Sequence, residues 1–261
     1  MRIALSLLLA AALVRAPTAA AATDTRPLTA NERATFEKLL CDFPIMQGKE
    51  LACAALREYP RSTVGATLSL YAIAYGSFAR AGADEAYLSY GSSVEPHSSN
   101  YGGGVLFVRV DGSWRLVKWY PGQQMDNCLA LPGAGQTKML CLAGWTGQGE
   151  TDTSLWVREL PFTHDMAVLK AQDDRDTGSD IMCPDLPAAP MLLSIDALKR
   201  SRDPAAFAVA SITYATAKDA AEACRHGGFA HVRTNKGEAT IVIERGRVRA
   251  IVPLRFAPSD Q

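Results

Sequence analysis

The sequence predicts a mainly β protein, built as a meander, sandwich or partial propeller, with an N-terminal helical hairpin and an α+β C-terminal part. From about Val64 onward, apolar residues recur at every second position in many short runs, which is typical of half-buried strands. Gly-rich or Asp-Gly turns separate these runs, most clearly at Asp111-Gly112. The predicted organisation is a signal peptide (1–22), a helical hairpin (23–62), a β-rich domain (63–172), a crossover (173–193) and an α+β part (194–261).

The first residues predict export. A positive head at Arg2 precedes an apolar run of 12 residues, Ile3–Val14, interrupted by one serine. This run is shorter than the roughly 20 residues that span a bilayer. Ala20 and Ala22 then form an A-x-A cleavage pattern. We therefore expect cleavage near Ala22, a mature amino terminus at Thr23, no transmembrane segment in the mature chain, and a secreted or periplasmic location.

The composition excludes an electrostatic nucleic-acid binder. The 261 residues include 27 basic and 27 acidic side chains, so no basic excess exists to neutralise phosphates. The glycines of Gly144-x-x-Gly147-x-Gly149 precede a predicted strand, whereas phosphate binding needs a helix amino terminus. No cofactor is expected.

The six cysteines predict three disulfides, because an even number in an exported chain indicates a disulfide framework. One pair flanks a Gly-containing turn between two short strands, and another brackets the break between two predicted helices. The third pair follows by elimination, which leaves no free thiol. No C-x-x-C motif supports a redox site or a zinc ribbon. The predicted pairs are Cys128–Cys141, Cys41–Cys53 and Cys183–Cys224.

The N-terminal hairpin is predicted from two helical patterns. Thr29 and Glu32 form a capping box, which satisfies the first free amides of a helix that ends before Pro44. A second short helix fits Lys49–Arg57, which places its apolar residues on one face. We expect this hairpin to pack against the body of the protein.

The β-rich domain contains seven candidate strands. They are Thr67–Tyr75, Glu85–Tyr90, Val105–Val110, Trp114–Trp119, Lys138–Leu142, Ser154–Arg158 and Met166–Lys170.

The C-terminal part mixes helical and strand patterns. The helix Ala217–Arg225 has Thr216 as its cap and Gly227-Gly228 as its stop. A further helix fits Ile195–Arg200, and strands fit Phe207–Tyr214, Phe229–Arg233, Ala239–Glu244 and Val248–Leu254.

Two stretches share a pattern of glycine and aromatic residues that leads through an aspartate into a strand. Gly76-Ser77-Phe78 leads through Asp84, and Gly144-Trp145-Thr146 leads through Asp152. This pattern resembles the FG-GAP repeats of integrin-type β-propellers. The resemblance implies a β architecture and an extracytoplasmic binding role. Both stretches lack the acidic D-x-D-x-D-G loop of that family, so no calcium ligands are implied.

Two groups of residues are candidate metal ligands, and each has a simpler explanation. The acidic run Asp173–Asp180 could hold calcium, but Gly178 stands where an acid or Asn is needed, which favours a solvated loop. Cys224, His226 and His231 could bind a transition metal. A disulfide at the cysteine and a helix C-terminus at the first histidine explain them better. No metal site is predicted.

Two further patterns could carry function. His97-Ser98-Ser99-Asn100 precedes three glycines and could form part of a hydrolase site, although a polar loop explains the same residues. Aromatic residues near the Gly-rich loops could form a platform for a sugar or peptide, or fill the β core. These aromatic residues are Trp114, Trp119, Tyr120, Trp145 and Trp156.

The sequence as a whole favours an exported, disulfide-stabilised binding or structural protein of unknown ligand, with peptides and carbohydrates as the candidates. The alternative is a secreted hydrolase that uses the His97 region. Whether the protein is an enzyme stays open, and no catalytic residue is assigned.

Overall fold

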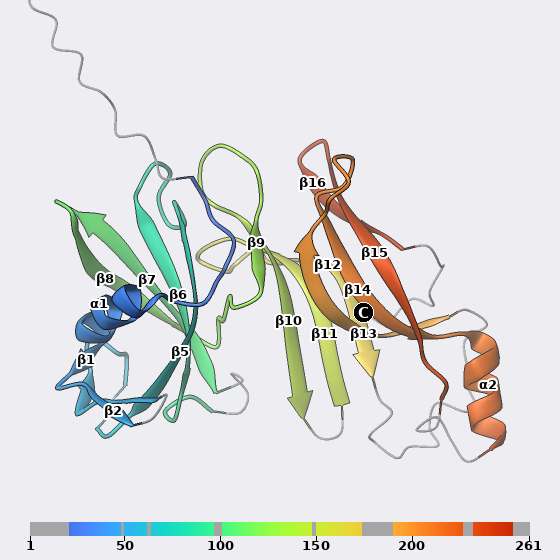
Figure 1. Ribbon diagram of the computed structural model, residues 1–261, viewed down its shortest axis with the longest axis horizontal. Coiled ribbons are helices and arrows are strands. Elements are labelled where there is room, and N and C mark those ends of the chain that lie inside the picture. The colour runs from blue at the N-terminus through green and yellow to red at the C-terminus, as the bar shows by residue number, and fades with distance from the viewer. Residues whose placement is uncertain are drawn as a thin grey trace, which may run out of the picture.

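The described part of the chain folds into four antiparallel sheets and two short α-helices (Figure 1). The predicted mainly β class is confirmed, and each large sheet has its strands in sequence order, as in a meander. No helix among the described residues is long and apolar enough to cross a membrane. The computed structural model describes residues 21–47, 50–61, 64–96, 101–147, 150–173, 190–226 and 232–252.

The largest sheet is a six-stranded half-barrel, and helix α1 (Ala30–Leu40) packs across its open side. Phe36 and Leu40 of the helix join a core with Phe107 and Trp119 of the sheet. Each of the four strands predicted between residues 67 and 119 lies within one of the observed strands. The strands are β2 (Ile45–Gln47), β3 (Glu50–Ala52), β5 (Thr67–Gly76), β6 (Glu85–Ser92), β7 (Gly102–Val110) and β8 (Ser113–Pro121).

The predicted helical hairpin is wrong in its second half. The first helix forms as expected, with both hydrogen bonds of the Thr29–Glu32 capping box. The stretch predicted as a helix over Lys49–Arg57 instead contains β3 and β4 (Ala55–Leu56), and β4 pairs with β1 (Cys41–Asp42). A nine-residue helix is marginal by itself. Pairing with β5 satisfies the backbone and buries Leu51 in the half-barrel core, so the strand prevails.

Two four-stranded sheets follow the half-barrel in the sequence, and they pack face to face around an aliphatic core. Figure 1 shows them beside the half-barrel, with β9 lying between. One sheet contains β9 (Cys128–Ala130), β10 (Met139–Gly147), β11 (Glu150–Arg158) and β12 (Met166–Asp173). The other contains β13 (Met191–Arg200), β14 (Ala208–Ala215), β15 (Asn235–Glu244) and β16 (Arg247–Ile251).

The predicted helix Ile195–Arg200 is also wrong, because these residues belong to β13. A register shift lies between Ile195 and Ala197. As a result, Ile195 and Leu198 point into the same core although they are three residues apart. The bulge therefore imitates the spacing of a helix.

The second predicted helix of this part is confirmed as α2 (Ala217–Arg225), which is capped by Thr216. The predicted strand Ala239–Glu244 lies within β15, and the strand Val248–Leu254 overlaps β16 as far as Ile251. The predicted strand Phe229–Arg233 is not seen at Val232 and Arg233, and its first three residues lie outside the described chain.

The predicted disulfide pairs Cys41–Cys53 and Cys128–Cys141 are both present. The first ties the end of α1 to the segment after β3, and the second joins β9 to β10. Cys224 is also disulfide-bonded. Its predicted partner, Cys183, lies outside the described residues.

Candidate functional site

A groove between α1 and the β7–β8 hairpin is a candidate site within the described residues. Its volume is about 580 Å³, within the range of small-ligand sites. We call it the α1 groove. It is lined by Asn31, Ala34, Thr35, Lys38, Leu39, Gly112, Ser113 and Trp114.

Helix α1 supplies one wall of the α1 groove because of its amphipathic spacing. Phe36 and Leu40 point into the half-barrel, which turns Asn31, Thr35 and Lys38 outward. These three residues follow one another at intervals of three or four, so they share one face of the helix. The sheet therefore fixes which side chains face the groove.

The β7–β8 turn supplies the other wall. Asp111 and Gly112 have φ angles of 51° and 79°, the left-handed conformation that a two-residue hairpin turn requires. This tight turn brings Ser113 and Trp114 opposite the helix. Strand β8 pairs only with β7 among the described strands, so it is the edge of the half-barrel next to the groove.

Three polar side chains in the α1 groove have no partner within the described chain. Lys38 forms no ion pair there, and the side chains of Asn31 and Ser113 form no hydrogen bond. The hydroxyl of Thr35, in contrast, donates to the Asn31 backbone oxygen at 2.8 Å. The free groups can donate hydrogen bonds to a ligand, and the only charged group lining the groove is a cation.

Other side chains already pack against the Trp114 ring. The Arg109 guanidinium lies 4.4 Å from the ring centroid, and it also pairs with Asp84. The rings of Phe36 and Tyr75 lie 5.7 and 5.8 Å from the ring. A sugar platform needs an open aromatic face, so Trp114 serves as a packed wall.

The other predicted platform residues lie apart from the groove. Trp119 is buried, and its indole N–H donates to the Arg57 backbone oxygen at 2.8 Å. Ammonium groups lie over two of the remaining rings, with Lys118 over Tyr120 and Lys170 over Trp156. Trp145 lies in β10. The structure therefore does not gather these aromatic residues into one platform.

A buried carboxylate lies elsewhere in the half-barrel. Glu95 accepts hydrogen bonds from the hydroxyls of Tyr59 and Tyr90, the latter at 2.8 Å. Burial, reinforced by Glu95, raises the pKa of Tyr59 to about 12 and that of Tyr90 well above its ordinary value. Both hydroxyls are therefore protonated donors at neutral pH. The cluster ties the segment after β6 to the sheet.

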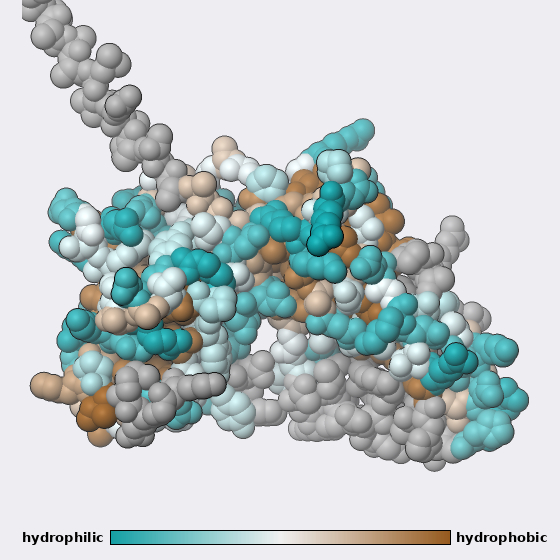
Figure 2. Space-filling view, viewed as in Figure 1, coloured by the Kyte–Doolittle hydropathy of each residue, from teal (hydrophilic) through white to brown (hydrophobic). Residues whose placement is uncertain are grey.

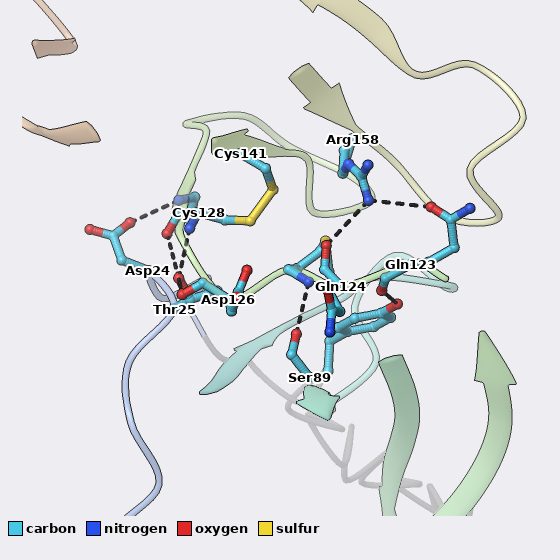
Figure 3. Close-up of a disulfide and its surroundings, with 12 residues drawn as sticks. Asp24, Thr25, Ser89, Gln123, Gln124, Asp126, Cys128, Cys141 and Arg158 are labelled. Atoms are coloured by element: carbon cyan, nitrogen blue, oxygen red, sulfur yellow. Dashed lines mark hydrogen bonds between the residues drawn. A yellow bond between two sulfur atoms is a disulfide. The ribbon is translucent and has the colours of Figure 1, made fainter. Parts of the chain in front are cut away.

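The joint between the half-barrel and the next sheet also contains polar groups (Figure 3). Arg158 donates to the Gln123 side chain and to the Gln124 backbone oxygen, both at 3.2 Å. Its Nε lies 3.7 Å from Asp165. Burial raises the pKa of this aspartate. Aromatic side chains around Tyr87 fill the rest of the joint, so we assign it a structural role.

The candidate hydrolase segment His97-Ser98-Ser99-Asn100 lies outside the described residues. So do most of the acidic run after Asp173 and the histidine His231. His226 caps the C-terminus of α2. The described chain contains no group of three or more His, Cys, Asp or Glu side chains placed to hold a metal ion.

A second exposed feature is apolar. Figure 2 shows hydrophobic residues at the lower left, near β1 and β2. In this part of the chain, Phe43 is 82% exposed and Ile45 is 63% exposed. Phe43 lies between β1 and β2 and Ile45 begins β2, and neither side chain offers a polar group to orient a ligand. The α1 groove combines polar and apolar walls and is the better candidate.

No family model, curated protein or solved structure matches the chain. The resemblance to FG-GAP repeats stays a prediction. Of its two stretches, Gly76 ends β5, whereas Gly144-Trp145-Thr146 lies within the paired part of β10 and forms no turn.

Proposed function

We propose that this protein is exported and binds an extended, carboxylate-bearing peptide in the α1 groove. The observation that carries the proposal is the position of unpartnered polar side chains between a helix and the edge strand β8. Disulfide bonds persist in oxidising compartments, so the cysteine pairs support a location outside the cytoplasm. Cleavage after Ala22 would release the mature protein.

The edge strand favours a peptide. An extended peptide can add to an open sheet edge through backbone hydrogen bonds, while alternate side chains enter a neighbouring groove. Ser113 and Trp114 begin β8 and also line the groove, so a peptide paired there would pass α1. A carbohydrate is less well supported because other side chains pack against Trp114.

The charge of the α1 groove favours a carboxylate. Lys38 is its only charged lining residue, and Asn31 and Ser113 add neutral hydrogen-bonding groups. A charge-assisted hydrogen bond is roughly twice as strong as a neutral one. A peptide carboxylate, either terminal or from an acidic side chain, therefore suits this wall of the groove.

A peptide-retention experiment tests the proposal. The mature protein is incubated with a randomised octapeptide pool bearing free carboxylates, and the retained peptides are sequenced and quantified. We expect acidic or free-acid peptides to be enriched. Lys38→Gln should weaken their binding about twofold to fivefold, because an ion pair at an exposed lysine is lost.

Two controls make this result specific. Lys199→Gln removes an exposed charge from β13 and should leave retention unchanged. A backbone N-methylated pool cannot donate ladder hydrogen bonds and should be retained poorly. Equal retention by both lysine variants, or no retention by the unaltered protein, would contradict the proposal.

A further inference from the structure

The four residues after the predicted cleavage site connect three sheets. We call Thr23–Arg26 the strap. Ala21 and Ala22 are exposed, and Thr23 is the first described residue with a hydrogen bond. The boundary of the A-x-A pattern therefore coincides with the start of the packed structure.

The strap pairs with the free edge of β5. The backbone N–H of Thr23 donates to the Tyr75 oxygen at 2.9 Å, and the Tyr75 N–H donates to the Thr23 hydroxyl at 2.9 Å. Arg26 and Ile73 exchange two backbone hydrogen bonds of 3.1 and 2.8 Å. Strand β3 pairs with β5 only at Thr67 and Leu68, and the strap covers β5 further along, near Ile73.

The strap also forms hydrogen bonds with strand β9 (Figure 3). The Thr25 N–H donates to the Cys128 oxygen at 3.0 Å, and the Cys128 N–H donates to the Thr25 hydroxyl at 2.7 Å. Cys128 is also bonded to Cys141 of β10. The strap thus joins the half-barrel to a disulfide-linked strand pair.

Asp24 extends this connection to the last sheet. Its carboxylate accepts from the Ala130 N–H at 2.8 Å and from the Arg200 guanidinium at 3.0 and 2.5 Å. The guanidinium also donates to the Ala130 oxygen at 2.7 Å. Asp24 and Arg200 are 176 residues apart in the sequence. One carboxylate therefore links β9 with the end of β13.

We propose that the strap is a lock set by proteolytic processing, in which cleavage after Ala22 preserves the connection of the three sheets and trimming that removes Thr23–Arg26 releases it. Cleavage after Ala22 rests on the proposed export. Hydrolysis breaks the Ala22–Thr23 peptide bond with one water, which gives the Ala22 carboxylate and the Thr23 ammonium. That ammonium keeps a proton to donate to the Tyr75 oxygen. Cleavage at the Ala22–Thr23 bond therefore leaves the whole strap in place, whereas cleavage further along the chain removes part of it.

Hydrogen exchange of proteins with different starting residues tests the lock. Chains that begin at Thr23 and at Ala21 should exchange the amides of β9 at the same rate. A chain that begins at Pro27 lacks the strap and should exchange them at least about tenfold faster, since the Cys128 and Ala130 amides lose their part-buried acceptors on Thr25 and Asp24. Equal rates in all three chains would overturn the lock.

Point variants keep the test decisive if the shortened chain does not fold. Asp24→Asn retains an oxygen for the Ala130 N–H but loses the charge that holds Arg200. It should speed exchange at the end of β13 by about fivefold or more, and Arg200→Gln should add little to it. Asp84→Asn, which loses an ion pair within the half-barrel, is the matched control. Fully additive effects, or no effect beyond that of the control, would overturn the lock.

The native amino terminus separates this inference from the proposed export. Sequencing of the exported protein should find Thr23 first, and a start at Pro27 or later would overturn the processing limit. An uncleaved chain would contradict the proposed export, whereas the exchange rates test the lock independently.

Discussion

The half-barrel and the C-terminal pair of sheets are both antiparallel, but different side chains fill them. The half-barrel core includes four buried aromatic side chains, Phe36, Tyr90, Phe107 and Trp119, among leucines and other aliphatic residues. The core between the two C-terminal sheets contains only leucine, isoleucine, valine and alanine among its buried residues. Side chains of two stacked sheets interdigitate across a core about 10 Å thick. In the half-barrel, the Phe36 ring of α1 instead packs 4.7 Å from the Phe107 ring of the sheet.

This difference bears on where the protein binds its ligand. Closing the half-barrel requires helix α1, and the helix creates the α1 groove along the edge strand β8. Two sheets that pack directly on one another need no such helix. We infer that the half-barrel carries the ligand site and that the C-terminal sheets stabilise it through the joint and the strap.

Core truncations in the two regions should therefore have different consequences. Phe107→Ala should lower the free energy of unfolding by about 3–5 kcal/mol, and Leu155→Ala by about 2–5 kcal/mol. Phe107 packs 4.7 Å from Phe36 of α1, so its loss should also weaken peptide binding. Leu155 lies in the C-terminal core, and its loss should leave binding by the folded protein unchanged. Urea titrations and the peptide-retention assay measure the two effects. Equal loss of binding in both variants would contradict the inference that the ligand site lies in the half-barrel.

The two disulfides with both cysteines among the described residues are a matched pair, and their loss should have the next largest effect. Their sequence separations are 12 and 13, so each should contribute about 3 kcal/mol through loop entropy. Replacing Cys128 and Cys141 by serine should increase exchange on both sides of the joint. Replacing Cys41 and Cys53 should increase it only around β1 and β4. Exchange that spreads equally in both variants would show that the joint has no special role.

The smallest expected effect is confined to the half-barrel and to alkaline pH. Because the pKa of Tyr59 is raised from 10 to about 12, the folded state holds the proton more tightly than the unfolded state. The resulting stability is fully present below pH 10 and is lost as the pH rises toward 12. Tyr59→Phe should flatten this loss in urea titrations at pH 9–11. An unchanged pH dependence would contradict the raised pKa that burial and Glu95 give to Tyr59.

Local signals in the sequence predict much of the fold. The capping boxes at Thr29 and Thr216, the Asp111-Gly112 turn and the alternating runs each fix a structure within a few residues. Both incorrect helix predictions fall on residues whose structure is decided by pairing with strands that lie elsewhere in the sequence. The predicted second helix of the hairpin does not form, because its residues include strand β3, which pairs with β5. In β13, a bulge gives Ile195 and Leu198 a helical spacing.

The α1 groove was harder to predict than the fold. Trp114 is noticeable in the sequence as an aromatic residue in a predicted strand. Lys38 and Asn31, in contrast, look like ordinary solvent-facing residues of a helix. Their meaning depends on α1 crossing the half-barrel beside the β7–β8 turn, which no local pattern encodes. Glu95 and the strap were missed for the same reason, because their partners are far away in the sequence or have no motif.

The most direct test of the account is to map peptide binding by backbone amide chemical shifts. The mature protein is titrated with the peptide most enriched from the free-acid pool. The account predicts the largest shifts in α1 from Asn31 to Lys38 and in β8 from Ser113 to Leu116, with small shifts in the C-terminal sheets. Shifts centred on the C-terminal sheets or around Phe43, with α1 and β8 unaffected, would contradict it.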